Sequence, residues 1–189
     1  ITNIYLLFLH FLLKYIQEVD MEEIDILEEN GEIVGTTTVN EAHQNGLLHK
    51  VVHVWIVNRR NKLLVQKRSD LKEFCPLMWD VSFAGHIKAG ENSLDACERE
   101  AKEELGLNID DDELKFLFSI IENFEEGKIR ELADVYILHK DLDLTDLILD
   151  KNEVEEVKWV PFHEFFVTCM TKKFVPHEEE YRLLKEVLK

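Results

Sequence analysis

The chain has 189 residues, of which 46% are hydrophobic and 32% charged, and this balance favours one globular domain with at most a short appendage. Its formal net charge of −17 disfavours binding to nucleic acid or to an anionic membrane, because the phosphate groups there would repel it. The three cysteines, Cys75, Cys97 and Cys169, include no CxxC pair, which excludes a cysteine-based zinc site and favours a reducing, cytoplasmic environment.

Residues 1–20 form an apolar extension before the acidic stretch that begins at Met21. The apolar run within it is about ten residues long, whereas a membrane-spanning helix needs about 20. A signal peptide would start with basic residues and end with small ones, and neither is present. We therefore treat residues 1–20 as a leader, an artefact or an extra helix on the core, and residues 21–189 as the functional domain.

The first predicted elements are strands. Residues 24–27 and 32–38 flank Asn30 and Gly31, a pair that tolerates the positive φ of a hairpin turn. Residues 51–57 are a nearly continuous apolar run rich in β-branched side chains, which predicts a strand buried on both faces. A polar turn at 58–62 then returns the chain through an antiparallel strand at 63–66.

The later elements mix strands with helices. We predict strands at 79–84, 114–121, 132–139 and 157–160. Pro161 is expected to open a helix, and residues 176–188 form a second, amphipathic one. Mixed strands around one strong helix at 93–105 predict an α+β sandwich.

That strong helix lies in the stretch GHIKAGENSLDACEREAKEELGL, residues 85–107. Asn92 or Ser93 can cap its start, and Gly106 stands where a left-handed C-terminal cap is expected. One of its faces is apolar at helical spacing, with Leu94, Cys97, Ala101 and Leu105. We expect this face to pack on the sheet.

Another face of the helix carries Glu100, Glu103 and Glu104, whose i, i+3 and i+4 spacing makes their carboxylates converge. Like charges so placed repel one another unless a cation lies between them, and Arg99 offsets part of that repulsion. Ligands that are all oxygen select Mg²⁺ or Mn²⁺ over zinc. Such a site suits attack of water on a diphosphate, with a spare carboxylate as base. The plainer alternative is a solvated acidic face.

The complete spacing decides between these alternatives. Gly85, five residues, Glu91, seven residues and then REAKEELGL at 99–107 resembles the Nudix box at every fixed position. The resemblance implies a Nudix-type α/β/α sandwich with a mixed β-sheet, and a metal-dependent hydrolase that cleaves a diphosphate linkage in a nucleoside diphosphate-type metabolite. It implies metal binding by Glu100, Glu103 and Glu104, one of them also the base, orientation by Arg99, loop support by Glu91, and a candidate ligand in the Gly85 carbonyl.

Residues from about 24 to 159 are similar to one branch of that family, type I isopentenyl diphosphate isomerase and its hydrolase-like relatives. The similarity lies in HQNGLLHKVVHVWIVN, LLVQKRSDLKEFCPLMWD and SFAGH. It implies a metal held by His43, His49, His86 and Glu131, although the spacing from His43 to His49 is one residue shorter than expected. Without the resemblance, these histidines would be interpreted as neutral surface or strand residues.

The isomerases have a catalytic cysteine immediately before the Gly-His pair, where this chain has Ala84. Isomerases also tend to have a degraded Nudix box, whereas this one is complete. Both departures favour hydrolase chemistry. The alternatives are an isopentenyl diphosphate delta-isomerase and a catalytically silent binding module of the same fold, a class that usually loses box carboxylates.

Six basic residues lie between positions 59 and 72 of this acidic chain. Arg59, Arg60 and Lys62 fall in a predicted turn and are interpreted as surface charge. Lys67 and Arg68, at the strand end near the box, are candidates to bind the substrate diphosphate, and the matching arginine does so in the branch. Trp79 is a candidate to stack on a base, although a tryptophan on a short strand is more often part of the core.

Nudix enzymes often take a further acidic ligand or base from beyond the box. The candidates are Glu122, Glu125, Glu126, Glu131 and Asp134. Strand alternation places Glu131 and Asp134 on opposite faces, and we favour Glu131 as the inward one. The sequence identifies a small-molecule diphosphate as the substrate class but not the leaving moiety, and it leaves open a homodimer, which is common among relatives.

Overall fold

The computed structural model describes residues 22–189, so the expectations for residues 1–20 lie outside the described part of the chain. Its strands are β1 (Glu23–Leu27), β2 (Ile33–Thr38), β3 (Leu48–Val57), β4 (Lys62–Arg68), β5 (Trp79–Asp80), β6 (Phe83–His86), β7 (Leu114–Phe124), β8 (Ile129–His139) and β9 (Val154–Pro161). Its α-helices are α2 (Val39–Gln44), α3 (Ser93–Leu105), α4 (Phe162–Thr168) and α5 (Glu178–Val187), with short 3-10 turns η1 (Asp111–Glu113), η2 (Glu125–Gly127) and η3 (Leu144–Asp146).

Strand β3 is the centre of the sheet. It runs antiparallel to β1, β4 and β6, and parallel to β8 along its whole length. Strand β7 pairs with β8, β9 pairs with β4, and β1 and β2 form the predicted hairpin. The predicted mixed sheet is confirmed, and the apolar run at 51–57 forms its centre because those side chains can be buried on both faces.

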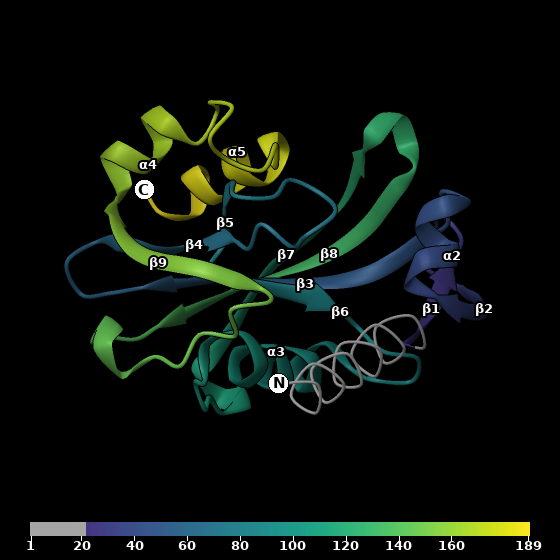
Figure 1. The fold of residues 1–189 in the computed structure, drawn as a ribbon, viewed down its shortest axis with the longest axis horizontal. Coiled ribbons are helices and arrows are strands. Elements are labelled where there is room, and N and C mark those ends of the chain that lie inside the picture. Colours follow the sequence, from purple (N-terminus) through teal and green to yellow (C-terminus); the bar gives the residue numbers. More distant parts are fainter. Residues whose placement is uncertain (1–21) are drawn as a thin grey trace, which may run out of the picture.

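Alternate residues of β3 contribute to two separate cores. The core beneath α4 and α5 contains Val51, Trp55, Phe165, Tyr181 and Leu184. The core beneath α3 contains Val52, Val54, Phe83, Cys97 and Leu105. Figure 1 shows the sheet edge-on between these helices, with α3 on one side and α4 and α5 on the other. This layering confirms the α/β/α sandwich.

Helix α3 begins and ends where its sequence predicts. The Asn92 side chain accepts hydrogen bonds from the backbone N–H groups of Leu94 and Asp95, and Gly106 ends the helix with φ of 65°. Glycine is needed there both for this left-handed conformation and because an added Cβ would lie 2.8 Å from the Cβ of Ile148. Among residues 22–189, no helix has the length and apolarity that crossing a bilayer requires.

The strand expected at 79–84 is wrong in one respect, because the chain changes partner within it. Strand β5 pairs with β4, and β6 pairs with β3. Between them, the Ser82 hydroxyl donates to the carbonyl of Leu64 and accepts from the N–H of Ile56, both at 2.7 Å. Ser82 thus satisfies backbone groups where β3 and β4 diverge, and the predicted single strand becomes two.

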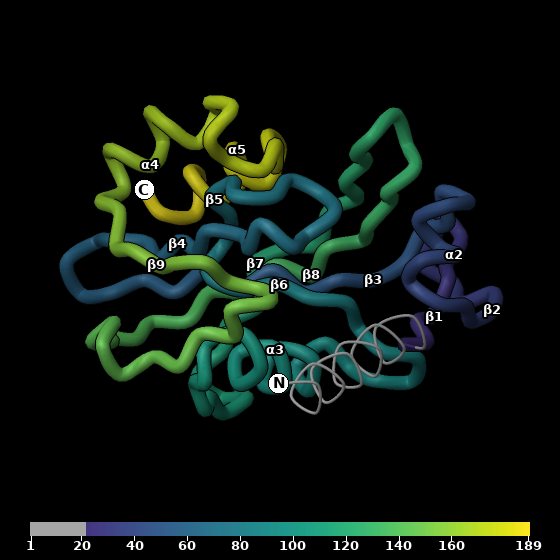
Figure 2. Tube along the Cα trace, viewed as in Figure 1, coloured from purple at the N-terminus to yellow at the C-terminus, as the bar shows by residue number. Residues whose placement is uncertain are grey.

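The C-terminal segment returns to β5 before α5 begins. The backbone N–H of Trp79 donates to the carbonyl of Lys173 at 2.8 Å, and the backbone carbonyl of Trp79 accepts from the N–H of Val175 at 2.9 Å. Figure 2 shows this yellow segment lying beside β5. The pairing carries His177, the residue before α5, to the edge of the sheet.

Candidate active site

Arg99 on α3 is the central contact of the box residues. Its guanidinium donates to the two carboxylate oxygens of Glu91 at 2.9 and 2.8 Å, and to the carbonyl of His86 at 2.8 Å. It also donates to Glu100 at 2.5 Å and to Glu103 at 3.2 Å. Burial opposes its charge, but Glu91 and Glu100 outweigh this and raise the pKa of Arg99. Arg99 therefore joins the loop before α3, the end of β6 and two box carboxylates.

Glu100 and Glu104 lie against consecutive residues of β6. A Cβ added to Gly85 would lie 2.0 Å from both Cδ and Oε1 of Glu100. The N–H of Ala84 donates to Oε2 of Glu104 across 3.4 Å. The first glycine of the box is thus required because a carboxylate approaches the backbone closely.

Burial governs the electrostatics of these two side chains. It raises the pKa of Glu100 to about 7, with Arg99 acting against the shift and Glu103 adding to it. Burial, reinforced by Glu100, also raises the pKa of Glu104 well above its ordinary value. Two buried carboxylates whose charged forms are disfavoured are groups that a divalent cation would stabilise.

The third box carboxylate is placed differently. The Glu103 side chain is 54% exposed and turns toward Arg99. Within residues 22–189, the places where three or more ligand atoms lie within 4.8 Å of one another belong to two other groups of side chains. The helix brings the three box carboxylates to one edge without forming one such group: Arg99 Nη1 reaches both Glu100 and Glu103, whereas Glu104 accepts from the N–H of Ala84.

The first of those two groups combines three histidines and an acid from four elements. It comprises His43 of α2, His49 of β3, His86 of β6 and Glu131 of β8. The ring centroids lie 5.1 to 5.6 Å apart, and Nε2 of His49 lies 3.9 Å from Oε1 of Glu131. Strand pairing produces this arrangement, because His49 is directly opposite Glu131 and His86 is opposite the second residue after His49.

These four residues fit a metal ion. Nε2 of each of the three histidines is buried without a hydrogen-bond partner among residues 22–189. Nδ1 of His49 donates to the carbonyl of Leu47, which leaves its Nε2 lone pair free. Burial lowers the pKa of all three histidines, to about 4 for His49 and well below the ordinary value for His86. Three neutral imidazoles with a carboxylate suit zinc or another borderline transition metal.

The second group, His53, Glu122, His177 and Glu180, is a buried ion-pair network. Nδ1 of His53 donates to Glu180 at 2.6 Å, and His177 donates to Glu122 at 2.5 Å and to Asp80 at 3.0 Å. Burial disfavours the charged histidines, but these carboxylates outweigh it and raise the pKa of both. Ring nitrogens that carry protons cannot bind a metal, so this group does not fit one.

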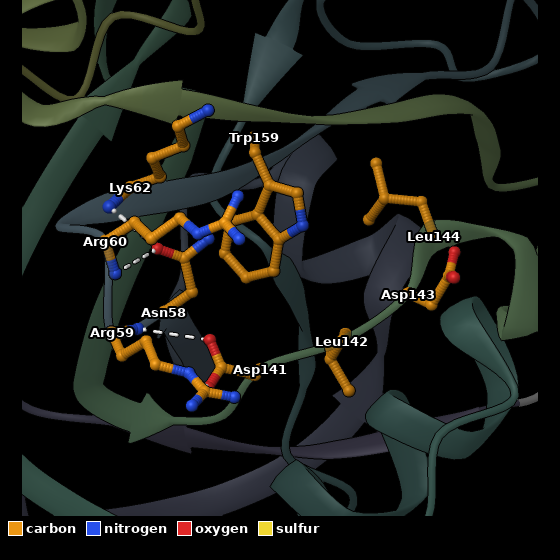
Figure 3. Close-up of a pocket in the computed structure, with 9 residues that line it drawn as sticks. All are labelled: Asn58, Arg59, Arg60, Lys62, Asp141, Leu142, Asp143, Leu144 and Trp159. Atoms are coloured by element: carbon orange, nitrogen blue, oxygen red, sulfur yellow. Dashed lines mark hydrogen bonds and ion pairs between the residues drawn. The ribbon is translucent and has the colours of Figure 1, made fainter.

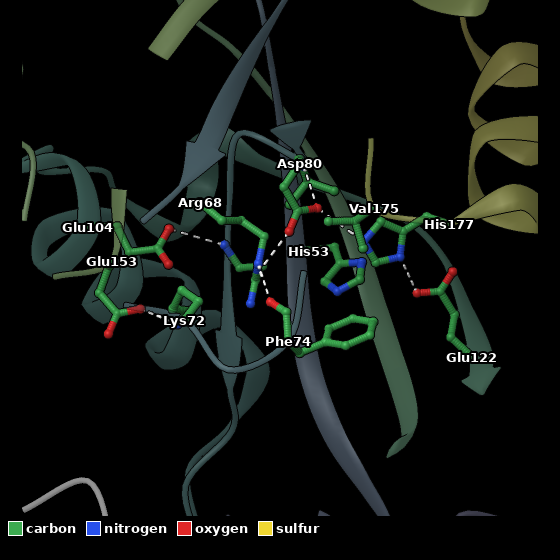
Figure 4. A network of polar contacts seen from close by, with 12 residues as sticks. His53, Arg68, Lys72, Phe74, Asp80, Glu104, Glu122, Glu153, Val175 and His177 are labelled. Atoms are coloured by element: carbon green, nitrogen blue, oxygen red, sulfur yellow. Dashed lines mark hydrogen bonds and ion pairs between the residues drawn. The ribbon is translucent and has the colours of Figure 1, made fainter. Parts of the chain in front are cut away.

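Arg68 and Lys72 are the basic residues that the fold brings to the box. Both lie close enough to Glu104 to oppose the effect of burial on its pKa. Figure 4 shows the Arg68 guanidinium between the carboxylates of Glu104 and Asp80, and its Nη1 donates to Asp80 at 3.0 Å. Lys72 forms an ion pair with Glu153. Positive charge therefore lies beside the box carboxylates.

The structure places two other predicted substrate-binding residues elsewhere. Lys67 and Trp79 are directly paired between β4 and β5, so they share the sheet face opposite to that of Arg68. The Lys67 ammonium bonds to Glu156 at 3.2 Å, and Lys158 lies over the Trp79 ring, 3.7 Å from its centroid. Of the three substrate-binding candidates, the structure brings Arg68 to the box.

A cavity of about 800 Å³ lies at the opposite end of these strands (Figure 3). Its lining comes from residues 58–60, Lys62, residues 141–144 and Trp159. Lys62 begins β4 whereas Arg68 ends it, so this cavity is separated from the box by the length of the strand. Arg59 is 81% exposed there and pairs with Asp141, in agreement with its interpretation as surface charge.

Sequence reasoning missed Asp80 and His177, and it named Glu122 only as a candidate metal ligand or base. Asp80, Glu122 and His177 form hydrogen bonds across 55 to 97 positions of sequence. No local spacing could have indicated these contacts, because each residue lies on a different element. The available signal was Asp80, the one charged residue within the predicted strand at 79–84.

A comparison with protein-family models matches the NUDIX domain to residues 47–183. The chain belongs to the NUDIX family. This Nudix protein is 41% identical over 158 residues to an uncharacterized Nudix hydrolase of Listeria monocytogenes, covering 83% of the chain and 90% of the relative. It is also 33% identical over 130 residues to isopentenyl-diphosphate Delta-isomerase 1 of Photorhabdus laumondii, covering 67% of the chain and 73% of the relative.

Solved structures agree with the fold. The crystal structure of a protein from Deinococcus radiodurans superimposes with a TM-score of 0.71 at 23% identity, covering 87% of this chain and 98% of the other. The family model and the Nudix hydrolase relatives make the chain a hydrolase of phosphorus-containing acid anhydrides, within a family whose hydrolases need divalent metals. The resemblance to the isomerase branch is confirmed as well.

Proposed function

We propose that this Nudix hydrolase cleaves the diphosphate linkage of a nucleoside diphosphate-type metabolite by attack of water on phosphorus, with Mg²⁺ or Mn²⁺ at the box. The observation that carries the proposal is the pair of carboxylates held against β6, the largely buried Glu100 and the buried Glu104. Arg68 and Lys72 bring positive charge to the same edge. A metal–diphosphate complex requires anionic groups that bind the cation and, beside them, cationic groups that bind the phosphates.

Glu100 and Glu104 would hold the cation, with Glu103 and the Gly85 carbonyl as further ligands. Bound there, a divalent cation supplies charge neutralisation at the phosphate and a more acidic water. Arg99 keeps the Glu100 carboxylate in place through a 2.5 Å hydrogen bond. A box carboxylate accepts the proton that the attacking water loses.

Arg68 is suited to the substrate phosphate. Its Nε donates to the carbonyl of Phe74 at 3.1 Å and its Nη1 to Asp80 at 3.0 Å, which orient the guanidinium. The remaining donors lie on the side of Glu104, where a planar fork can bind two phosphate oxygens. Lys72 adds a point charge at the same place.

We also assign the group of His43, His49, His86 and Glu131 to a second, transition metal ion. The support is the set of three buried and unpaired Nε2 atoms that face one another, with the Glu131 carboxylate beside them. This site shares β6 with the box, because His86 directly follows Gly85. Its metal would lie beside the catalytic edge.

The second candidate function is isopentenyl diphosphate isomerisation, favoured by this histidine group and by the isomerase relative. Ala84 opposes it, because a methyl group cannot transfer a proton. Two free cysteines near the box do not replace the missing group: Cys97 lies on the buried face of α3, and burial raises the pKa of the Cys75 thiol. A catalytically silent module is disfavoured because the box is complete.

The test is a panel of nucleoside diphosphates, sugar nucleotides, dinucleotides and prenyl diphosphates, assayed with Mg²⁺ and with Mn²⁺. We expect phosphate-bond cleavage of at least one nucleotide class and no interconversion of isopentenyl and dimethylallyl diphosphate. Glu103→Gln and Glu100→Gln should each reduce the activity, whereas Glu98→Gln, on the same helix but outside the box set, should not. Isomerase activity with no hydrolysis, or hydrolysis unaffected by both box variants, would contradict the proposal.

A further inference from the structure

A chain of buried polar contacts leads from Arg68 to the C-terminal helix. Arg68 Nη1 donates to Oδ2 of Asp80 at 3.0 Å, and His177 Nε2 donates to Oδ1 of the same carboxylate at 3.0 Å. The other ring nitrogen of His177 donates to Glu122 at 2.5 Å. Figure 4 shows these side chains one beside the next in space, from Glu104 at one end to Glu122 at the other. This row of polar contacts connects Glu104 of the box with His177, the residue before α5.

Asp80 is held from three sides. Besides Arg68 and His177, the backbone N–H of Val81 donates to it at 2.8 Å, and the Asp80 side chain is only 3% exposed. A buried carboxylate that accepts from three fixed donors has one favoured orientation, because rotation would leave donors unpaired at a cost. The position of the Arg68 guanidinium depends on that orientation.

His177 is itself fixed by α5 and the strands. It is 3% exposed, and both of its ring nitrogens are engaged. One turn further along α5, Glu180 accepts from His53 at 2.6 Å and from the Trp55 indole at 2.7 Å. The first turn of α5 is thereby anchored to β3, and the imidazole has no alternative place.

We propose that His177 is a positioning residue for the hydrolase: through Asp80 it fixes the Arg68 guanidinium in the orientation that binds the substrate diphosphate. The inference rests on the proposed function, because it assigns the diphosphate to Arg68. It makes the segment before α5 part of the substrate site although it lies far from the box in sequence. His177 touches neither the substrate nor the reacting atoms, and it acts on binding.

The experiment is a double-mutant cycle between His177 and Arg68. His177→Gln should raise KM about tenfold while kcat stays within a factor of about two, since an interaction common to ground state and transition state is lost. In an Arg68→Met background the same change should have almost no further effect on KM, because its target is gone. His163→Gln, at an exposed position on α4, is the matched control and should match the wild type.

Two further measurements keep the test decisive. Binding of methylene diphosphonate with Mg²⁺, measured by calorimetry, reports on Arg68 without turnover and should weaken about tenfold in His177→Gln. Asp80→Asn should reproduce the effect if His177→Gln does not fold, as judged by circular dichroism. Equal effects of His177→Gln in both backgrounds, or unchanged diphosphonate binding, would overturn the positioning role. A wild type that binds diphosphonate but hydrolyses nothing on the panel would instead overturn the proposed function alone.

Discussion

Replacing Gly85 with alanine tests whether close packing of the Glu100 carboxylate against β6 is needed for catalysis. The added Cβ would lie 2.0 Å from Cδ and Oε1 of Glu100, whereas ordinary contact starts at 3.4 Å. The carboxylate must therefore retreat by about the difference, 1.4 Å. A misplacement of about 1 Å in a catalytic arrangement can cost about 100-fold, or about 2.7 kcal/mol of transition-state stabilisation. We expect kcat/KM to fall by at least about that factor.

The same variant should remain folded, because the obstructing atoms are the far end of a flexible side chain. The assay is kcat/KM with Mg²⁺ on the best substrate of the panel, together with the thermal unfolding temperature. Gly35→Ala is the matched control, since its Cβ would meet Ile26 only at 3.4 Å. A Gly85→Ala enzyme with wild-type kcat/KM would refute the argument that this gap exists for the carboxylate.

Three further predictions follow from the site. Glu104→Gln should raise the Mg²⁺ concentration needed for half-maximal activity about 10- to 100-fold, and an unchanged Mg²⁺ titration would remove Glu104 from the metal site. His49→Gln should lower the zinc or manganese that copurifies with the protein to near zero, measured by mass spectrometry; undiminished metal would exclude the histidine group. His177→Gln should cost about 3 kcal/mol in urea unfolding. Against the effect of burial, the neighbouring carboxylates raise the pKa of His177. The folding stability that its ion pairs contribute is therefore complete below pH 6.5 and is lost as the pH rises through the raised pKa. Against the effect of burial, His177 and Arg68 hold the pKa of Asp80 below 3.8, so the stability from the Asp80 ion pairs is lost only in stronger acid. A difference between wild type and variant that grows from pH 7 to pH 9 would contradict this.

Much of the fold could be predicted because its signals are local. The apolar run at 51–57 predicts a strand buried on both faces, and Asn92 and Gly106 mark the two ends of α3. The strand at 79–84 could not be predicted correctly, because its division depends on where β3 and β4 separate. That separation is a property of the assembled sheet, and the Ser82 hydroxyl that bridges it resembles any other buried serine in the sequence.

For the candidate site, the box residues were recognisable from spacing, but their individual directions were not. The helical repeat puts Glu100, Glu103 and Glu104 on one face. Only the packed structure turns Glu103 toward solvent and the other two toward β6. Lys67 and Arg68 illustrate the same limit, because adjacent strand residues point to opposite faces and the sequence does not reveal which face meets α3.

The sequence by itself determined the family, the box helix and the types of ligand atom it offers, since these depend on residue identity at short, fixed intervals. The family resemblance in the sequence also indicated that three histidines meet Glu131, but only the tertiary structure decided how closely they lie and that His177 reaches Arg68 through Asp80. Most of these residues lie far apart in the chain, and only strand pairing and the return of the C-terminal segment bring them into contact. Burial then gives them their chemistry, because removal from water leaves the three histidines neutral and makes the ion pairs around His177 strong.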